Sequence, residues 1–270
     1  MTRKRIRNIL EKEWEVLARD PSTMLLIVLI PFLILGEAIV VIWLVAKFGA
    51  GPIIDNPFFQ GPLGKFVAAV HGAAGLEAID QVRLFLLAQL NFFILLIPTM
   101  IAINSTAYSI VEEKLSRSLE PLLATPVRTW ELMFGKALAG AIPALAMTWL
   151  IAAVSLLPVV VLGWGRLIPY FVNATWFLDL FLLAPCITVL SFLLGVIGSS
   201  RAKDARSAQN LVLFIIFPVL GLIAVQLSGL LWFTPLLTLA LSIGVGLIDG
   251  IVLRIAVRLF HRESIVIAWR

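Results

Sequence analysis

Long apolar runs constrain this chain more than any other feature. The first, from Met24 to Ala46, has one charged residue in about 23 and would be roughly 35 Å long as a helix, enough to cross a bilayer. Hydrophobic residues make up 61% of the 270 residues and charged residues 14%, against about 45–50% and 25% in soluble domains. With a single cysteine as well, the composition excludes a soluble enzyme, a disordered tail and a secreted disulfide scaffold. The sequence predicts an all-α membrane protein with one transmembrane domain, residues 1–270.

Six segments are apolar and long enough to be predicted as transmembrane helices. Their approximate boundaries are 24–46, 84–106, 133–161, 176–198, 210–231 and 235–257. The basic residues orient them: 17 of the 21 lie on one side, and the other side has only Lys47, Lys65, Arg83 and Arg166. The positive-inside rule therefore places both termini in the cytoplasm and residues 47–83 outside, as the longest loop. A multi-pass protein of the cell inner (plasma) membrane is predicted, and the net charge of +5 is explained without nucleic acid as a partner.

Residues 2–19 are predicted to form an amphipathic helix that lies in the interface of the bilayer. One helical face carries Ile6, Ile9, Leu10, Trp14 and Leu17. Arg and Lys residues crowd the other positions, so the helix would be attracted to anionic lipid, with Trp14 at headgroup depth. The alternative is a short solvated segment that leads into the first span.

Two carboxylates lie inside the predicted spans. Glu37 is near the middle of the first span and Asp249 is within the sixth. Insertion of each costs about 2.5–3.5 kcal/mol, so each is expected to face protein or water. The helix rise separates them by about 10 Å in depth, so no direct contact is expected. One interpretation is a proton or cation relay through both; the preferred one is that Ser, Thr, Asn or water satisfies them at packing interfaces. Asp179, near the outer end of the fourth span, is expected to be solvated.

Motifs for nucleotide or metal binding are absent from the sequence. Neither Gly-Lys pair, 64–65 or 135–136, is followed by the Ser or Thr that a P-loop requires. The two histidines, His71 and His261, lie on opposite predicted sides, and Cys186 has no partner ligand nearby in sequence. The chain itself is therefore not expected to be an enzyme, to bind a metal or to hold a cofactor.

The cytoplasmic segment 111–136, after the second span, is the most informative part of the sequence. It reads V-E-E-K-L-S-R-S-L-E-P-L-L-A-T-P-V-R-T-W-E-L-M-F-G-K. One helical face of its first part carries Leu115, Leu119, Leu122 and Leu123. A Thr-Pro pair at 125–126 then ends this helix, because Pro disfavours helical backbone at the preceding residue. A cytoplasmic helix with exposed leucines needs a partner, and its mixed charges suit a groove on a protein better than an anionic membrane.

This segment resembles the signature of the type-2 ABC transporter permeases, the exporters of drugs, lipids and polysaccharides. The family pattern reads roughly E-x-G-T-L-E-x-L-L-x-T-P, followed by a helix that ends in G-K. Its counterparts in this chain are Ser118-Leu119-Glu120, Leu122-Leu123, Thr125-Pro126 and Gly135-Lys136. Arg117 stands where the family usually has glycine. Residues 19–21 and Pro31 are also similar to the start of the family's first span, and six spans with both termini inside match its layout.

The resemblance implies that the chain is the permease subunit of an ATP-driven exporter. It would pair with a second permease, as a homodimer or a heterodimer, and with two copies of a separate ABC ATPase that binds ATP and Mg²⁺. The segment is similar to the family's coupling helix, which docks in a groove of the ATPase. The residues this assigns to coupling are Glu112, Glu113, Lys114, Leu115, Leu119, Glu120, Leu122, Leu123, Thr125 and Pro126. The missing P-loop, found independently, agrees with a transporter whose ATPase is a separate chain.

The substrate pathway would run between the two permeases, lined in this family largely by the second and fifth spans. The candidate pathway residues are Phe92, Phe93, Asn104, Phe214 and Phe217, for which packing in the core or against lipid is an equal alternative. Two other classes of function stay open. One is a secondary transporter that uses the intramembrane acids Glu37 and Asp249, and the other is a membrane-embedded transferase without a recognised motif.

Overall fold

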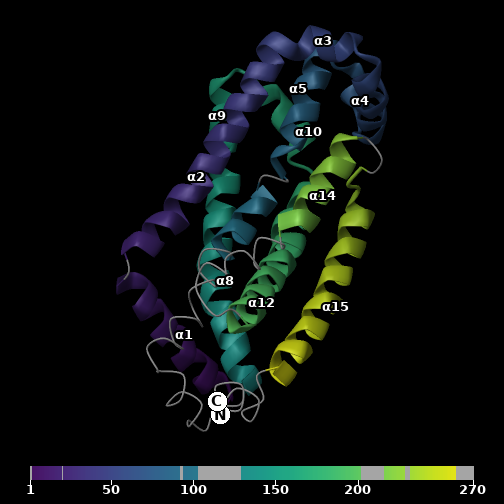
Figure 1. The fold of residues 1–270 in the computed structure, drawn as a ribbon. Helices are drawn as coiled ribbons and strands as arrows, with labels where there is room; N and C mark the ends of the chain where they lie inside the picture. The colour runs from purple at the N-terminus through teal and green to yellow at the C-terminus, as the bar shows by residue number, and fades with distance from the viewer. Residues whose placement is uncertain are drawn as a thin grey trace.

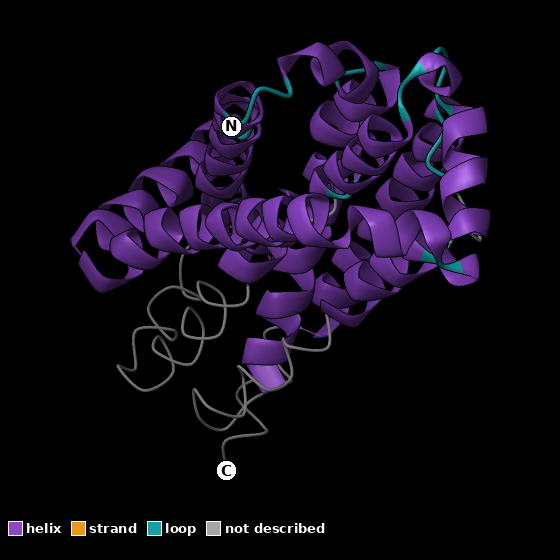
Figure 2. Cartoon of the chain, turned by 90° about the horizontal axis from the view of Figure 1, so that it is seen from above, coloured by secondary structure: helices purple, strands orange, loops and turns teal. Residues whose placement is uncertain are grey.

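The computed structural model describes residues 2–19, 21–91, 94–102, 129–201, 216–228 and 232–259. Helices make up nearly all of these residues, and no strand occurs within the described ranges (Figure 2). The main helices in chain order are α1 (Thr2–Arg19), α2 (Pro21–Leu44), α3 (Ala50–Asp55), α4 (Pro57–Ala69), α5 (Ala78–Ala88), α8 (Thr129–Val154), α9 (Leu156–Val161), α10 (Ile168–Phe171), α11 (Ala174–Leu178), α12 (Ala184–Arg201), α14 (Ile216–Leu227) and α15 (Pro235–Leu259). Short π-helical or 3₁₀ segments join some of them, namely η1 (Val45–Gly49), η2 (Ala73–Gly75), η3 (Gly165–Leu167) and η4 (Asp179–Leu183).

Four helical stretches of the described chain are long and apolar enough to cross a membrane. They are Ile27–Gly49, Trp130–Val161, Ala174–Gly198 and Pro235–Arg258. These correspond to the predicted first, third, fourth and sixth spans. Of the second predicted span, residues 84–88, 90–91 and 94–102 are helical; of the fifth, the structure describes α14, an apolar helix shorter than a full span. The all-helical membrane fold is confirmed, while the count of six spans stays a prediction.

The first and last described helices, α1 and α15, reach the same end of the helical bundle. In Figure 1, α1 and the last turns of α15 lie at one end of the bundle, and α3, α4, α9 and α10 lie at the opposite end. The long helices α2, α8, α12 and α15 run between these ends. We call the end with α3 and α4 the cap end and the other end the α1 end.

The cap end corrects the prediction that residues 47–83 are a loop. Most of them are helical, in η1, α3, α4, η2 and the start of α5. Asn56 caps α4, because its side chain accepts a hydrogen bond from the Phe58 N–H at 2.9 Å, and Pro57 occupies the first turn, where its missing N–H costs nothing. Of the prolines in this segment, Pro57 therefore begins a helix, and Pro62 lies inside α4. The helix α5 begins at Ala78, six residues before the predicted start of the second span at residue 84.

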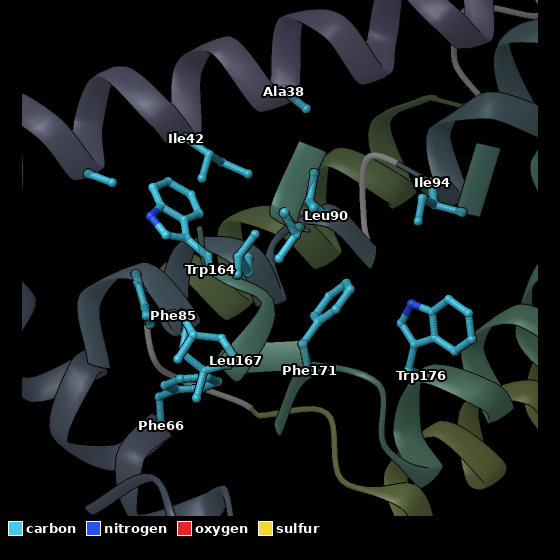
Figure 3. Packing of buried hydrophobic residues seen from close by; sticks show 14 of the residues in the cluster. Ala38, Ile42, Phe66, Phe85, Leu90, Ile94, Trp164, Leu167, Phe171 and Trp176 are labelled. Atoms are coloured by element: carbon cyan, nitrogen blue, oxygen red, sulfur yellow. The ribbon is translucent and has the colours of Figure 1, made fainter. Parts of the chain in front are cut away.

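Aromatic packing and a buried carboxylate hold the cap together. Figure 3 shows Phe66, Phe85, Leu167, Phe171 and Trp176 gathered from different elements of the cap end. The rings of Phe66 and Phe85 pack edge to face, with centroids 5.6 Å apart. Asp80 is buried at the start of α5, where it pairs with Arg166 at 2.6 Å and with Arg83 at 2.9 Å. Arg83 and Arg166, two of the four basic residues on the predicted outer side, thus have a structural role as the ion-pair partners of Asp80.

Candidate coupling and transport site

Most of the predicted site residues lie outside the part of the chain that the structure describes. Among the coupling residues these are Glu112, Glu113, Lys114, Leu115, Leu119, Glu120, Leu122, Leu123, Thr125 and Pro126; among the pathway residues they are Phe92, Phe93, Asn104 and Phe214. The described site therefore starts at the next element: α8 begins at Thr129, three residues after the Thr-Pro pair, and it contains the Gly-Lys pair of the signature.

Two ion pairs join α1 to the first turns of α8. The Lys136 Nζ lies 2.9 Å from the Glu13 Oε1, and the Lys136 side chain is only 3% exposed. The Arg5 Nη1 lies 3.3 Å from the Glu131 Oε2, and the Glu131 side chain is 1% exposed. Removing one partner of such a pair leaves a buried charge uncompensated, which is strongly destabilising. The pairing also alternates in sign, since α1 supplies one cation and one anion, and this fixes the register of the two helices.

Close backbone contact explains the glycine of the Gly-Lys pair. A Cβ added at Gly135 would lie 2.9 Å from the Ile9 Cγ2 of α1, a distance that real Cβ atoms essentially never show. Glycine therefore lets α1 approach α8 closely, and Lys136, the next residue, reaches Glu13. We call this contact, made by residues 5, 9, 13 and 14 of α1 with residues 131, 135, 136 and 139 of α8, the α1–α8 junction.

A proline creates the third polar contact of the junction. The Trp14 Nε1 donates a hydrogen bond to the Ala139 carbonyl at 2.9 Å. In an α-helix this carbonyl would accept from the residue four positions later, which is Pro143 and has no N–H. The indole thus satisfies a carbonyl that the helix itself cannot. The predicted amphipathic helix over residues 2–19 is confirmed as α1, but its Trp14 is bonded to α8; its placement in the bilayer interface stays a prediction.

The two predicted intramembrane acids have different surroundings. Glu37 is exposed on α2, and no described residue forms a hydrogen bond or ion pair with it. Asp249 is half-buried on α15, faces Cys186 of α12, and has an Oδ1 without a hydrogen-bond partner among the described residues. Within the described ranges nothing joins the two, as the difference in depth led us to expect. Phe217, the described pathway candidate, is 63% exposed on α14.

Asp179 corrects a prediction. It was expected to be solvated near the outer end of its span, yet it is only 5% exposed. Its Oδ2 accepts a hydrogen bond from the Asn91 Nδ2 at 3.2 Å, and Thr238 of α15 faces it. Position along one helix gives the depth of a residue but not what the neighbouring helices bring against it.

These features define a polytopic α-helical membrane protein whose amphipathic first helix is bound to the helix that follows the signature segment. The family model described as ABC-2 family transporter protein matches residues 7–249, most of the chain, and the protein belongs to that family. It is an ABC transporter permease, an integral membrane protein, and the family implies an ABC ATPase as its partner. The resemblance drawn from segment 111–136 is thereby confirmed. No curated protein and no solved structure matches the chain significantly.

Proposed function

We propose that this permease is half of the membrane part of an ATP-driven exporter, which forms its substrate pathway with a second permease and couples to two separate ATPase subunits. The observation that carries the proposal is the α1–α8 junction, directly after a segment with the type-2 signature in a chain of the ABC-2 family. ATP and Mg²⁺ would be bound by the ATPase, since this chain has no P-loop.

The junction supports a route for coupling. The leucine face and the charged residues between positions 112 and 126 would dock on the ATPase, and movement of this segment would be passed to α8, which begins at Thr129. Because α1 is ion-paired to α8, the two helices would move together. ATP binding can shift the permease between inward-facing and outward-facing states only if the ATPase binds this segment differently in the two states.

An exposed carboxylate supports the second permease. Glu37 lies on the same exposed face of α2 as Leu29, Leu33, Val40 and Leu44. A charged side chain in contact with lipid costs several kcal/mol, so this face requires a partner or a water-filled pathway. A second permease against α2, with the substrate pathway beside it, meets this requirement. Phe217, exposed on α14, would line the same pathway.

The alternative function is a secondary transporter that uses Glu37 and Asp249. Tagged permease should retain an ATPase subunit on purification, and transport by the purified complex in vesicles should require ATP. Glu37→Gln should leave protein level and ATP-driven transport largely intact, because nothing in the described structure pairs Glu37 with Asp249 or with a base. ATP-independent transport that Glu37→Gln abolishes at normal protein level would support the alternative.

The proposed topology, with both termini in the cytoplasm, is tested by cysteine labelling in a variant with Cys186→Ser. A cysteine at Gly61, where a Cβ meets no atom within 4 Å, should react with an impermeant thiol reagent added to intact cells. A cysteine at Ala205, outside the described residues, should react only after the cells are permeabilised. The control is the chain with Cys186→Ser alone, which should stay unlabelled. The reverse pattern would overturn the orientation.

A further inference from the structure

A lysine held over two aromatic rings, at the end of the first span, is not used by the proposed coupling mechanism. The Lys47 Nζ lies 4.8 Å from the centroid of the Trp43 ring and 5.4 Å from the centroid of the Phe48 ring. The two rings meet edge to face, with centroids 6.4 Å apart. Both rings are close enough to attract the ammonium group, since a ring attracts a cation over its face within about 6 Å. We call these three side chains the Lys47 site.

The π-helical turn η1 explains why the two rings lie on one side. Trp43 is in the last turn of α2, and Phe48 is five residues later, in η1. In a regular α-helix, side chains five residues apart point about 140° away from each other. A π-helical turn instead bonds residues that are five positions apart, so it brings Phe48 round to the side of Trp43. Trp43 also packs against the core of the cap end, which fixes the ring that Lys47 faces.

The position of the site along the first span places it at the depth of the lipid headgroups. The described span begins at Ile27, and Lys47 follows 20 residues later, which is about 30 Å along a helix and matches the thickness of the hydrocarbon core. In Figure 1, α2 runs from the α1 end of the bundle to the cap end, and η1 follows it there. Aromatic side chains are enriched at this boundary of the bilayer. Phe48 is exposed, and so is Val41, which lies on α2 nearer the bilayer centre.

The described part of the chain supplies no anion for Lys47. Its side chain is exposed, and it forms no ion pair or hydrogen bond with a described residue. Asp80 lies on α5, which packs against η1, but this carboxylate is already paired with Arg83 and Arg166. The positive-inside rule disfavours basic residues on the outer side. A cation that is kept there, at headgroup depth and beside no carboxylate, is therefore expected to meet an anion of the lipid.

We propose that the Lys47 site binds the phosphate of an anionic phospholipid, in the leaflet of the bilayer at the cap end. The ammonium group of Lys47 would donate hydrogen bonds to the phosphate oxygens, and Phe48 and Val41 would contact the acyl chains below. A zwitterionic headgroup fits less well, because its own cation would need an aromatic face or a carboxylate, and Lys47 already faces both rings. Charge complementarity thus favours a headgroup with a net negative charge. This inference goes beyond the proposed function and depends neither on a second permease nor on the ATPase.

Native mass spectrometry of the full-length permease tests the site. The protein is released from nanodiscs that contain equal amounts of phosphatidylglycerol, which is anionic, and phosphatidylcholine, which is zwitterionic. Wild type should retain phosphatidylglycerol in preference. Lys47→Gln, which removes the charge at similar length, should lower the ratio of bound phosphatidylglycerol to phosphatidylcholine about fivefold, the effect of one basic residue at an anionic surface.

Two further variants separate the site from the charge of the protein as a whole. Lys47→Arg should keep the wild-type ratio, because a guanidinium group also stacks on aromatic rings and binds phosphate. Lys65→Gln on α4 is the matched control: it removes another exposed basic residue of the predicted outer side and should leave the ratio unchanged.

Three results would overturn the proposal. Equal ratios in wild type and Lys47→Gln would show that the ammonium group holds no headgroup. An equal fall in Lys47→Gln and Lys65→Gln would show a general effect of net charge and no site. A wild-type dimer without bound phospholipid, together with a monomeric Lys47→Gln variant, would show that a second permease covers these side chains. Because the experiment measures neither transport nor ATPase binding, failure of the proposed function would leave its result unchanged.

Discussion

Replacing Leu119 and Leu122 with Asp should uncouple the transporter from its ATPase while the permease still inserts. The two leucines lie on one face of the predicted coupling helix, on a cytoplasmic segment with no core of its own to join. Burying one leucine side chain is worth roughly 1.5–3 kcal/mol, so the double variant loses that gain twice and must also desolvate two charges. We expect loss of ATPase co-purification, or retained co-purification with no stimulation of ATP hydrolysis by substrate.

The control for this variant keeps the apolar face. Leu119→Met with Leu122→Met preserves the hydrophobic surface at similar volume and should retain both the complex and stimulated hydrolysis. Membrane insertion of both variants is checked by the labelling of a cysteine at Gly61. Wild-type assembly and stimulated turnover in the Asp double variant would show that segment 111–136 is not the coupling element, and that the ATPase docks elsewhere.

The long apolar runs were sufficient to predict the helical membrane fold. A run such as Met24–Ala46 has few other options in a bilayer, where backbone groups must bond within the segment. The helices of the cap were not predicted, because residues 47–83 were assigned as one long loop. Pro57 instead occupies the first turn of α4 beside the capping Asn56, a position that proline favours. The sequence signal was present, as an Asn-Pro pair before an apolar stretch, and it indicates a helix start as well as a loop.

The site residues could be predicted only in part because their partners come from distant segments. The signature drew attention to Lys136, but nothing in the sequence pairs it with Glu13, 123 residues earlier. Asp179 was misjudged for the same reason, since its burial comes from Asn91 and Thr238. One useful signal was available: Pro143 leaves the Ala139 carbonyl without an intrahelical donor, so some donor from another element had to be close.

The packing of α8 against α12 leads to the second large effect, at Gly140. A Cβ at this position would lie 1.9 Å from the Cε1 of Phe192, whose side chain is only 1% exposed and is packed in the buried core rather than free to turn into solvent. Alanine is intrinsically better than glycine in a helix by about 1 kcal/mol, but overpacking a buried contact typically costs about 1–3 kcal/mol and occasionally more. At so short a distance we expect overpacking to win, and Gly140→Ala should lower the unfolding temperature of the purified permease and reduce its yield.

A second substitution and a matched control separate this clash from a general intolerance of the helices. Phe192→Leu removes ring atoms from the position that the new Cβ would occupy, so Gly140→Ala combined with Phe192→Leu should be more stable than the sum of the two single effects, as expected for residues in direct contact. Gly244→Ala on α15, where a Cβ meets no atom within 4 Å, should leave the unfolding temperature unchanged or raise it slightly. Equal stability of Gly140→Ala and Gly244→Ala would contradict this prediction. It would show that Phe192 of α12 does not lie against Gly140 of α8. Additive effects of Gly140→Ala and Phe192→Leu would show instead that the ring of Phe192 is not what fills the space beside Gly140.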